Sequence, residues 1–366
     1  MASGIRLEGI SKTFFHAERG AVHAVRSLDL VVKPGELVTL LGPSGCGKTT
    51  ALRMIAGFEN PTAGRIFIGE RDVTGIMPNK RSIGFVFQNY ALFPHMNIFE
   101  NVSYGLAVKG MPISQRHKEV ADVLQLVGLE GMERRQPSQL SGGEQQRVAL
   151  ARVIVTHPEV LLLDEPLSNL DAKRRVQMRS EIRRLQQSLN ITSLYVTHDQ
   201  EEALSISDRV IVMNQGEVAQ AGSPQEIYTH PASNFVAGFI GKVNSLPAVI
   251  ERLDAETATS AFAGQSFTTS RPSIELNQGD TVFLMVRPES ISLAAGGDSP
   301  SDDRSPRLHG RIEGITYMGE KMEYDVGLEG SVIKVTSYDP ATHGIFEPGQ
   351  DVGIVLREES MIVCKA

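Results

Sequence analysis

The chain has 366 residues, of which 41% are hydrophobic and 22% are charged, and its formal net charge is −7 at pH 7. This length favours two domains over one, and the composition is that of a globular protein rather than a disordered or fibrous one. The net negative charge argues against nucleic-acid binding as the main function, because nucleic-acid-binding domains usually carry a basic surface.

The sequence has no apolar run of about 18 residues and no charged-then-apolar leader, so we expect neither a membrane span nor export. The chain is therefore expected in the cytoplasm. Its two cysteines, Cys46 and Cys364, are expected to stay unpaired in that reducing compartment. Cys46 is open to interpretation as a reactive thiol at a helix N-terminus, but we favour a small residue that fits its loop.

Two short strands open the predicted fold, at residues 5–8 and 28–32, with a turn-rich segment at 16–20 between them. A turn at residues 33–36 then leads into an apolar strand at 37–41.

A phosphate-binding loop follows that strand and precedes a helix expected over residues 49–56. Its glycines allow consecutive backbone N–H groups to turn inward around phosphates. Lys48 can reach the β and γ phosphates, the Thr49 hydroxyl can ligate Mg²⁺, and the helix N-terminus adds its positive end. The alternative, a glycine-rich turn that binds nothing, is disfavoured by the flanking strand and helix. We expect the whole loop to bind the nucleotide: Gly42, Pro43, Ser44, Gly45, Cys46, Gly47, Lys48, Thr49 and Thr50.

Strands and helices alternate through the next part of the chain. A strand is expected at residues 65–68, and apolar residues recur at helical spacing over 114–127. Further helices are expected over 144–156 and 172–188, and a strand over 193–197. This order predicts a parallel α/β core with a helical insertion at about residues 90–155.

An apolar run at residues 160–163 ends in two carboxylates, Asp164 and Glu165, followed by Pro166. Ligands collect at the carboxyl end of a buried parallel strand. Asp164 is therefore expected to hold Mg²⁺, and Glu165 to face an attacking water. Ordinary capping acids at a helix start are the alternative, which the upstream phosphate loop disfavours.

Short alternating strands replace helices after about residue 234, at 281–287, 311–317, 322–326, 332–337 and 352–356, with a polar stretch at 295–306. This pattern predicts an all-β domain, one small barrel or two intertwined ones, over residues 238–366 after a first domain over 1–237.

Seven sequence features occur in the order that is typical of one family. They are Phe14 (or Phe15), the phosphate loop, Gln88 in FVFQ, the run LSGGEQQR at 140–147, the Asp164–Glu165 pair, SNLD at 168–171, and His198 in VTHD. Over about residues 5–235 the chain resembles the ATP-binding subunits of ABC transporters. The resemblance implies a P-loop NTPase fold of ABC type with ATP and Mg²⁺ as ligands, and ATP hydrolysis as the reaction.

The family's roles are carried over residue by residue. Glu165 would polarise water, His198 would touch the γ-phosphate, and Gln88 would contact Mg²⁺ or water. Phe14 would stack on adenine, although packing in the core is its alternative, and most relatives carry Tyr or Trp there. Asp171 would link the two sites of a dimer, and helix capping at residue 172 is compatible with that role.

The LSGGEQQR run begins the helix expected over residues 144–156. The start of this helix offers a second anion site, formed by Ser141, Gly142 and Gly143 with Gln145 nearby. An ordinary helix N-cap with Glu144 in the first turn is the alternative. The resemblance implies that two copies meet head to tail, so that Ser141 and Gly143 of one cover the γ-phosphate held by the other. Hydrolysis then requires a homodimer.

An apolar, aromatic segment at residues 91–106 is either a docking site for another protein or the core of the helical insertion, and both remain open. By resemblance the partner is a membrane permease, which places the chain on the cytoplasmic face of the inner membrane as a peripheral subunit. The β domain resembles the TOBE-like, OB-like accessory domain of importers that work with a periplasmic binding protein; its stretches at 238–245 and 286–289 carry this resemblance.

Polyamines such as spermidine or putrescine are the favoured cargo, with ferric iron next and sugars third. DNA-repair ATPases share the ATPase domain but insert long coiled coils between the phosphate loop and the LSGGEQQR run. Here only about a hundred residues, without sustained heptads, separate these two motifs. A non-hydrolysing sensor would lack Glu165 or His198, and both are present.

Overall fold

The computed structural model describes residues 3–16, 20–271, 274–295, 307–328, 330–339 and 344–365. Most of the turn expected at 16–20 and of the polar stretch expected at 295–306 lies outside these ranges. The chain forms two compact units, Met1–Pro224 and Gln225–Ala366.

The division differs from the expected boundary at residue 237. Helices α7 (Pro224–Thr229) and α8 (Asn234–Phe239) precede the β strands of the second unit. Arg287 donates to the Ala237 carbonyl over 2.9 Å, and Ala237 packs with Met285 and Cys364. These contacts make α8 part of the second unit.

A six-stranded sheet forms the centre of the first unit, in the order β10-β9-β3-β8-β7-β6. Its ladders are parallel except for the β9–β10 pair. Strands β3 and β8 are buried along their whole length and β7 at all but its last residue, because both faces of the sheet are covered. The bounds are β3 Leu37–Leu41, β6 Ile83–Val86, β7 Val160–Asp164, β8 Thr192–Thr197, β9 Arg209–Asn214 and β10 Glu217–Gly222.

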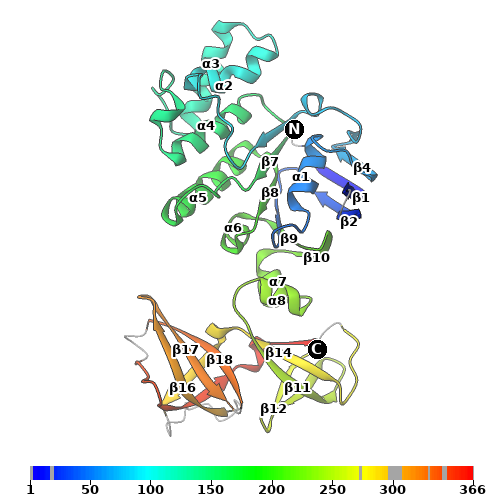
Figure 1. The fold of residues 1–366 in the computed structure, drawn as a ribbon, viewed down its shortest axis with the longest axis vertical. Helices are drawn as coiled ribbons and strands as arrows, with labels where there is room; N and C mark the ends of the chain where they lie inside the picture. Colours follow the sequence, from blue (N-terminus) through cyan, green and yellow to red (C-terminus); the bar gives the residue numbers. More distant parts are fainter. Residues whose placement is uncertain are drawn as a thin grey trace. The chain divides into compact units, whose positions relative to one another are not determined.

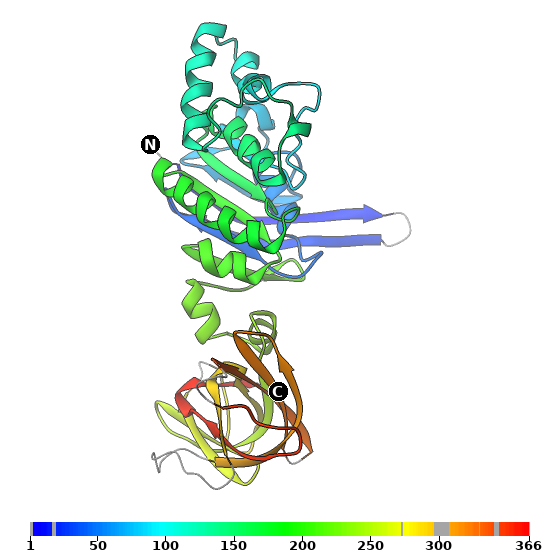
Figure 2. The same cartoon turned by 90° about the vertical axis from the view of Figure 1, so that its left-hand side faces the viewer.

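A second, antiparallel sheet has the order β2-β1-β4-β5, with β1 Ile5–His16, β2 Gly20–Val32, β4 Ala63–Ile68 and β5 Arg71–Asp72. The first two strands are much longer than predicted and extend together beyond the rest of the unit (Figure 2). Register shifts between Leu7 and Thr13 interrupt the side-chain alternation, which hid the strands in the sequence.

The helices form two groups (Figure 1). Helices α1 (Lys48–Ala56), α5 (Ala172–Leu189) and α6 (Gln200–Ile206) belong to the α/β core, while α2 (Ile98–Val108), α3 (Ile113–Leu126) and α4 (Gly142–Ile154) lie within the expected insertion. Short 3-10 turns occur at Pro78–Lys80 and Pro137–Gln139. In the described residues, no helix has the length and apolar character needed to cross a membrane.

The second unit consists of two five-stranded antiparallel sheets, in the orders β13-β12-β11-β14-β20 and β15-β19-β16-β17-β18. One apolar core joins them, with Leu246 and Val282 from the first sheet and Ile312 and Ile354 from the second. The bounds are β11 Asn244–Leu253, β12 Thr257–Phe262, β13 Gln265–Ser270, β14 Thr281–Val286, β15 Ile291–Ala295, β16 Arg307–Tyr317, β17 Lys321–Leu328, β18 Ser331–Tyr338, β19 Asp351–Leu356 and β20 Met361–Lys365, with 3-10 turns at Pro288–Ser290 and Glu358–Ser360. The all-β character is as expected, although β11, β12, β13, β15 and β20 were not predicted.

Candidate active site

The phosphate loop joins β3 to α1, as predicted. Gly47 has φ 102°, and a Cβ there would lie 2.2 Å from the Ala24 carbonyl oxygen, so only glycine fits. The Lys48 ammonium is buried and donates to the carbonyls of Gly42 at 2.7 Å and Pro43 at 2.9 Å. Cys46 is also buried, which agrees with its interpretation as a small residue that fits the loop.

Asp164 lies at the carboxyl end of β7 and meets the phosphate loop. The Thr49 hydroxyl donates to Asp164 Oδ1 over 3.1 Å. Burial raises the pKa of the Asp164 carboxyl, although the hydrogen bond from Thr49 opposes this effect. A hydroxyl and a carboxylate that converge in this way offer oxygen ligands of the kind that Mg²⁺ prefers.

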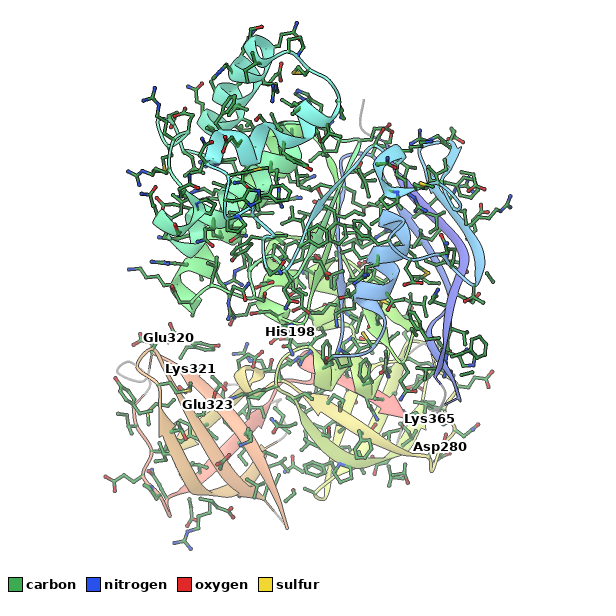
Figure 3. All side chains as sticks on the ribbon, turned by 45° about the horizontal axis from the view of Figure 1, so that its top comes forward. His198, Asp280, Glu320, Lys321, Glu323 and Lys365 are labelled. Atoms are coloured by element: carbon green, nitrogen blue, oxygen red, sulfur yellow. The ribbon has the colours of Figure 1, made fainter. Side chains whose placement is uncertain are left out.

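Glu165 is held by two of the other predicted residues. Gln88 Nε2 donates to Glu165 Oε2 over 3.2 Å, and His198 Nδ1 lies 3.2 Å from Glu165 Oε1. Gln88 follows β6 and His198 follows β8, so the ends of neighbouring parallel strands bring the three together. His198, labelled in Figure 3, keeps 62% of its side chain exposed.

A cavity of about 400 Å³ lies over the loop and these side chains, lined by Ala24, Ser44, Gly45, Gly47, Lys48, Thr49, Thr50, Glu165 and His198. Eight of these nine residues were predicted from the sequence. Ala24 was missed, because an alanine inside a strand carries no signal of its own. Asn169 was quoted only as part of a motif, yet it donates to the Gln88 carbonyl at 2.9 Å.

Ser141 starts helix α4 with a capping box: its hydroxyl accepts from the Glu144 N–H, and the Glu144 carboxylate accepts from the Ser141 N–H. Hydrogen bonds from Ser141 hold the pKa of Glu144 below its usual value. Ser141, Gly142, Gly143 and Gln145 do not line the cavity described above, and Gln145 donates to the Pro137 and Leu140 carbonyls. Within one chain, the capping interpretation is correct; the role across a dimer stays a prediction.

Asp171 likewise caps a helix, since its carboxylate accepts from the Arg174 N–H at 3.0 Å at the start of α5. Phe14 and Phe15 lie on β1, paired with Val22 and Ala21 respectively, so their side chains point to opposite faces of the strand. Phe14 is half-buried beside the Lys12 ammonium, and Phe15 is 82% exposed. Neither lines the cavity, and adenine stacking stays a prediction.

Comparison with known proteins identifies the family of this chain. Residues 25–168 match the family model described as ABC transporter, and residues 284–363 match the one described as TOBE domain. The Fe(3+) ions import ATP-binding protein FbpC of Rhizobium etli is 45% identical, over 99% of this chain and 98% of its own length. The chain belongs to the ABC transporter family.

Other relatives in the ABC transporter family carry two different cargo names. The Fe(3+) ions import ATP-binding protein FbpC 1 of Rhizobium meliloti is 47% identical, over 93% of this chain and 94% of its own length. The spermidine/putrescine import ATP-binding protein PotA of Acidothermus cellulolyticus is also 47% identical, over 88% and 83%.

A solved ABC structure resembles the first unit. The ATP-binding cassette MJ0796, described as dimeric in a post-hydrolysis state bound to ADP and Pi, is 32% identical with a TM-score of 0.54, over 60% of this chain and 98% of its own. The resemblance to ATP-binding subunits of ABC importers is therefore confirmed, as is the expected fold class of a P-loop NTPase with a C-terminal all-β domain. The chain is an ABC-type ATPase.

Proposed function

We propose that this ATPase powers the import of ferric ions through a membrane permease. The observation that carries the hydrolytic role is the convergence of Gln88 and His198 on Glu165 beside the phosphate loop. The cargo proposal is supported by the iron-import relatives, which match nearly the whole chain. Ferric iron, second in the ranking from sequence, therefore replaces polyamines as the preferred cargo, and polyamine import is the second candidate because of the Acidothermus relative.

Phosphoryl transfer depends mainly on positioning and charge neutralisation. In the proposed mechanism the loop N–H groups and Lys48 hold the ATP phosphates, and Glu165 orients the attacking water and accepts its proton. Gln88 and His198 fix the Glu165 carboxylate through one oxygen each. His198 then also faces the γ-phosphate with its exposed edge.

Thr49, Asp164 and Gln88 are the residues proposed to hold Mg²⁺. The fit rests on the Thr49 hydroxyl and Asp164 carboxylate, which already converge at 3.1 Å. When bound, the ion would neutralise charge on the β and γ phosphates. Asp164 is available as an anion for this task only above its raised pKa.

The proposed active form is a head-to-tail homodimer in which Ser141, Gly142, Gly143 and Gln145 of one copy cover the nucleotide of the other, with Asp171 at the contact. The exposed position of Ser141 and the dimeric state of the MJ0796 cassette support this proposal. Phe14 would carry the adenine base.

Helix α2 supports the proposal of a permease docking site, because it carries apolar side chains on an exposed face as well as on a buried one. Ile98, Val102 and Leu106 are buried in the core, while Tyr104 and Val108 are 42% and 72% exposed. Phe93 packs on Tyr104 with ring centroids 4.7 Å apart. A permease segment bound there would keep the subunit peripheral at the cytoplasmic membrane face, with a periplasmic binding protein supplying cargo.

The hydrolytic role is tested with Glu165→Gln, which keeps the size and polarity of the side chain but removes its charge. The variant should bind ATP with unchanged affinity, lose steady-state hydrolysis and accumulate as an ATP-bound dimer, as measured by nucleotide binding, phosphate release and light scattering. Retained hydrolysis would overturn the assignment of Glu165.

The cargo is tested with the same substitution in cells that carry the gene. Uptake of radiolabelled ferric ion should fall to background, while uptake of labelled spermidine should be unchanged. The reverse pattern would establish polyamine import in place of ferric-ion import.

A further inference from the structure

Two loops at the carboxyl edge of the central sheet carry residues to which the proposed mechanism assigns roles. Glu165 and the segment from Ser168 to Asp171 lie in the loop between β7 and α5, and His198 lies in the loop between β8 and α6. The contact between Glu165 and His198 joins the two loops at one point, and the proposed roles of these residues do not explain what else fixes the relative positions of the loops.

Arg175, in the first turns of α5, joins these two loops. Its Nε donates to the Leu170 carbonyl over 3.0 Å, and its Nη1 lies 3.4 Å from Asp199 Oδ2. Leu170 precedes Asp171, and Asp199 follows His198. One planar guanidinium therefore contacts both loops at once, which a lysine ammonium on a flexible stem would not reproduce.

The His198 loop is fixed from its other side by Glu202. This side chain is only 4% exposed, and its Oε2 accepts from the hydroxyls of Tyr195 at 3.0 Å and Thr197 at 2.8 Å. Asp199 Oδ1 accepts from the Glu202 N–H, and the Asp199 N–H donates to the Thr197 hydroxyl. These contacts tie the loop to β8 and α6, and Arg175 connects it to the loop before α5.

A small cavity lies where the loops meet. It measures about 50 Å³, and Glu165, Ser168, Arg175 and His198 are among its lining residues. The Ser168 hydroxyl is buried there without a hydrogen-bond partner in the described part of the chain. Arg175 borders this space and adds a polar bridge between the two loops to the contact between Glu165 and His198.

We propose that Arg175 is a positioning residue for ATP hydrolysis, which sets His198 relative to the Ser168–Asp171 loop through Asp199. This inference rests on the proposed roles of Glu165 and His198. It predicts a defect in the chemical step rather than in ATP binding, because Arg175 does not line the phosphate cavity.

The test is a steady-state kinetic comparison of the purified full chain carrying Arg175→Ala, Arg175→Lys or Asp199→Asn. Asparagine at position 199 keeps the helix cap of α6 and removes only the charge. We expect kcat to fall about tenfold to a hundredfold in Arg175→Ala, the cost of a small misplacement in an active site. The KM for ATP should stay within about twofold. In a double-mutant cycle, Asp199→Asn should add little to Arg175→Ala.

Arg179→Ala is the matched control, since Arg179 lies one turn further along α5 and pairs with Glu201 of α6 at the same 3.4 Å. This variant should keep the wild-type kcat. An equal loss of kcat in both variants, an unchanged kcat in Arg175→Ala, or additive effects of Arg175→Ala and Asp199→Asn would overturn the proposal. So would a fall in melting temperature accompanied by an equal loss of nucleotide binding in all three test variants.

Glu165→Gln and the wild type separate this inference from the proposed function. If the wild type hydrolyses ATP and Glu165→Gln does not, the proposed function stands whatever Arg175 does. If Glu165→Gln hydrolyses ATP normally, the proposed function fails first.

Discussion

Glu165 illustrates how far individual residues can be predicted. An acidic pair after an apolar strand predicts a role in hydrolysis for Glu165, and the structure brings Gln88 and His198 to its carboxylate. Its backbone could not be foreseen: φ is 43°, a left-handed conformation that costs a non-glycine residue about 1–2 kcal/mol. The Glu165 N–H donates to the Val196 carbonyl at 3.0 Å, which helps to hold this conformation. Strain of this kind collects at functional sites.

The contacts of Arg175 and Glu202 were likewise beyond the sequence. An arginine in a helix of many arginines and a glutamate in a first helical turn have ordinary surface interpretations. Only the packing of α5 and α6 on the sheet decides which of them are buried and what they meet.

Glu202 yields a prediction for pH dependence. Burial raises the pKa of the Glu202 carboxyl above its ordinary value of 4.5. The folded protein therefore binds a proton at Glu202 more tightly than the unfolded chain does. The stabilisation is complete below the unfolded pKa and is lost as pH rises through the folded pKa. The melting temperature of Glu202→Gln minus that of the wild type should therefore increase as pH rises from about 4 to 7.

Glu201→Gln is the control for this measurement, because the Glu201 side chain is 83% exposed. Its melting temperature should follow the wild type at a constant offset across the same range. A constant offset for Glu202→Gln as well would contradict the prediction.

At the scale of elements, strong periodicity decided what could be predicted. Helices α3 and α4 start within two residues of their predicted positions, since their apolar residues recur at helical spacing. Helix α2 was described only as an apolar segment, because apolar residues lie on its exposed face as well as its buried one. The short α6 offers too few turns for a periodic signal.

The start of α4 allows capping to be separated from the proposed nucleotide contact. Replacing a serine N-cap by glycine costs only a few tenths of a kcal/mol. Ser141→Gly should therefore keep its melting temperature, while ATP hydrolysis falls about a hundredfold through loss of a donor to the γ-phosphate.

Asn97→Gly is the matched control, since Asn97 and Glu100 form the same capping box at the start of α2. It should show the same small change in stability and normal hydrolysis by the isolated subunit. Equal hydrolysis in the two variants would leave Ser141 with a capping role alone.

At the scale of the whole molecule, the sequence predicted two domains of different class, and the structure has an α/β unit and a β unit. The second unit begins at Gln225, before the predicted boundary at residue 237, and includes α8, whose Ala237 carbonyl accepts a hydrogen bond from Arg287, 50 residues later in the chain. A contact of this range leaves no local signal.

The proposed hydrolysis mechanism requires a homodimer, and mixing inactive variants tests it. Lys48→Ala and Ser141→Gly each damage both sites of their own homodimer. In a mixed head-to-tail dimer one site combines the intact Lys48 of one subunit with the intact Ser141 of the other, while the second site carries both defects. Half of the dimers are mixed and each has one good site, so hydrolysis should recover to at most roughly a quarter of the wild-type rate.

Mixing Lys48→Ala with Glu165→Gln is the decisive control. Lys48 and Glu165 line the same cavity of one chain, so a mixed dimer of these two variants contains no site with both residues intact. This mixture should stay inactive at every ratio, whereas the first mixture should show maximal phosphate release at equal concentrations. Equal recovery in both mixtures, or none in the first, would exclude the head-to-tail arrangement, because only sites shared between subunits distinguish the two pairs.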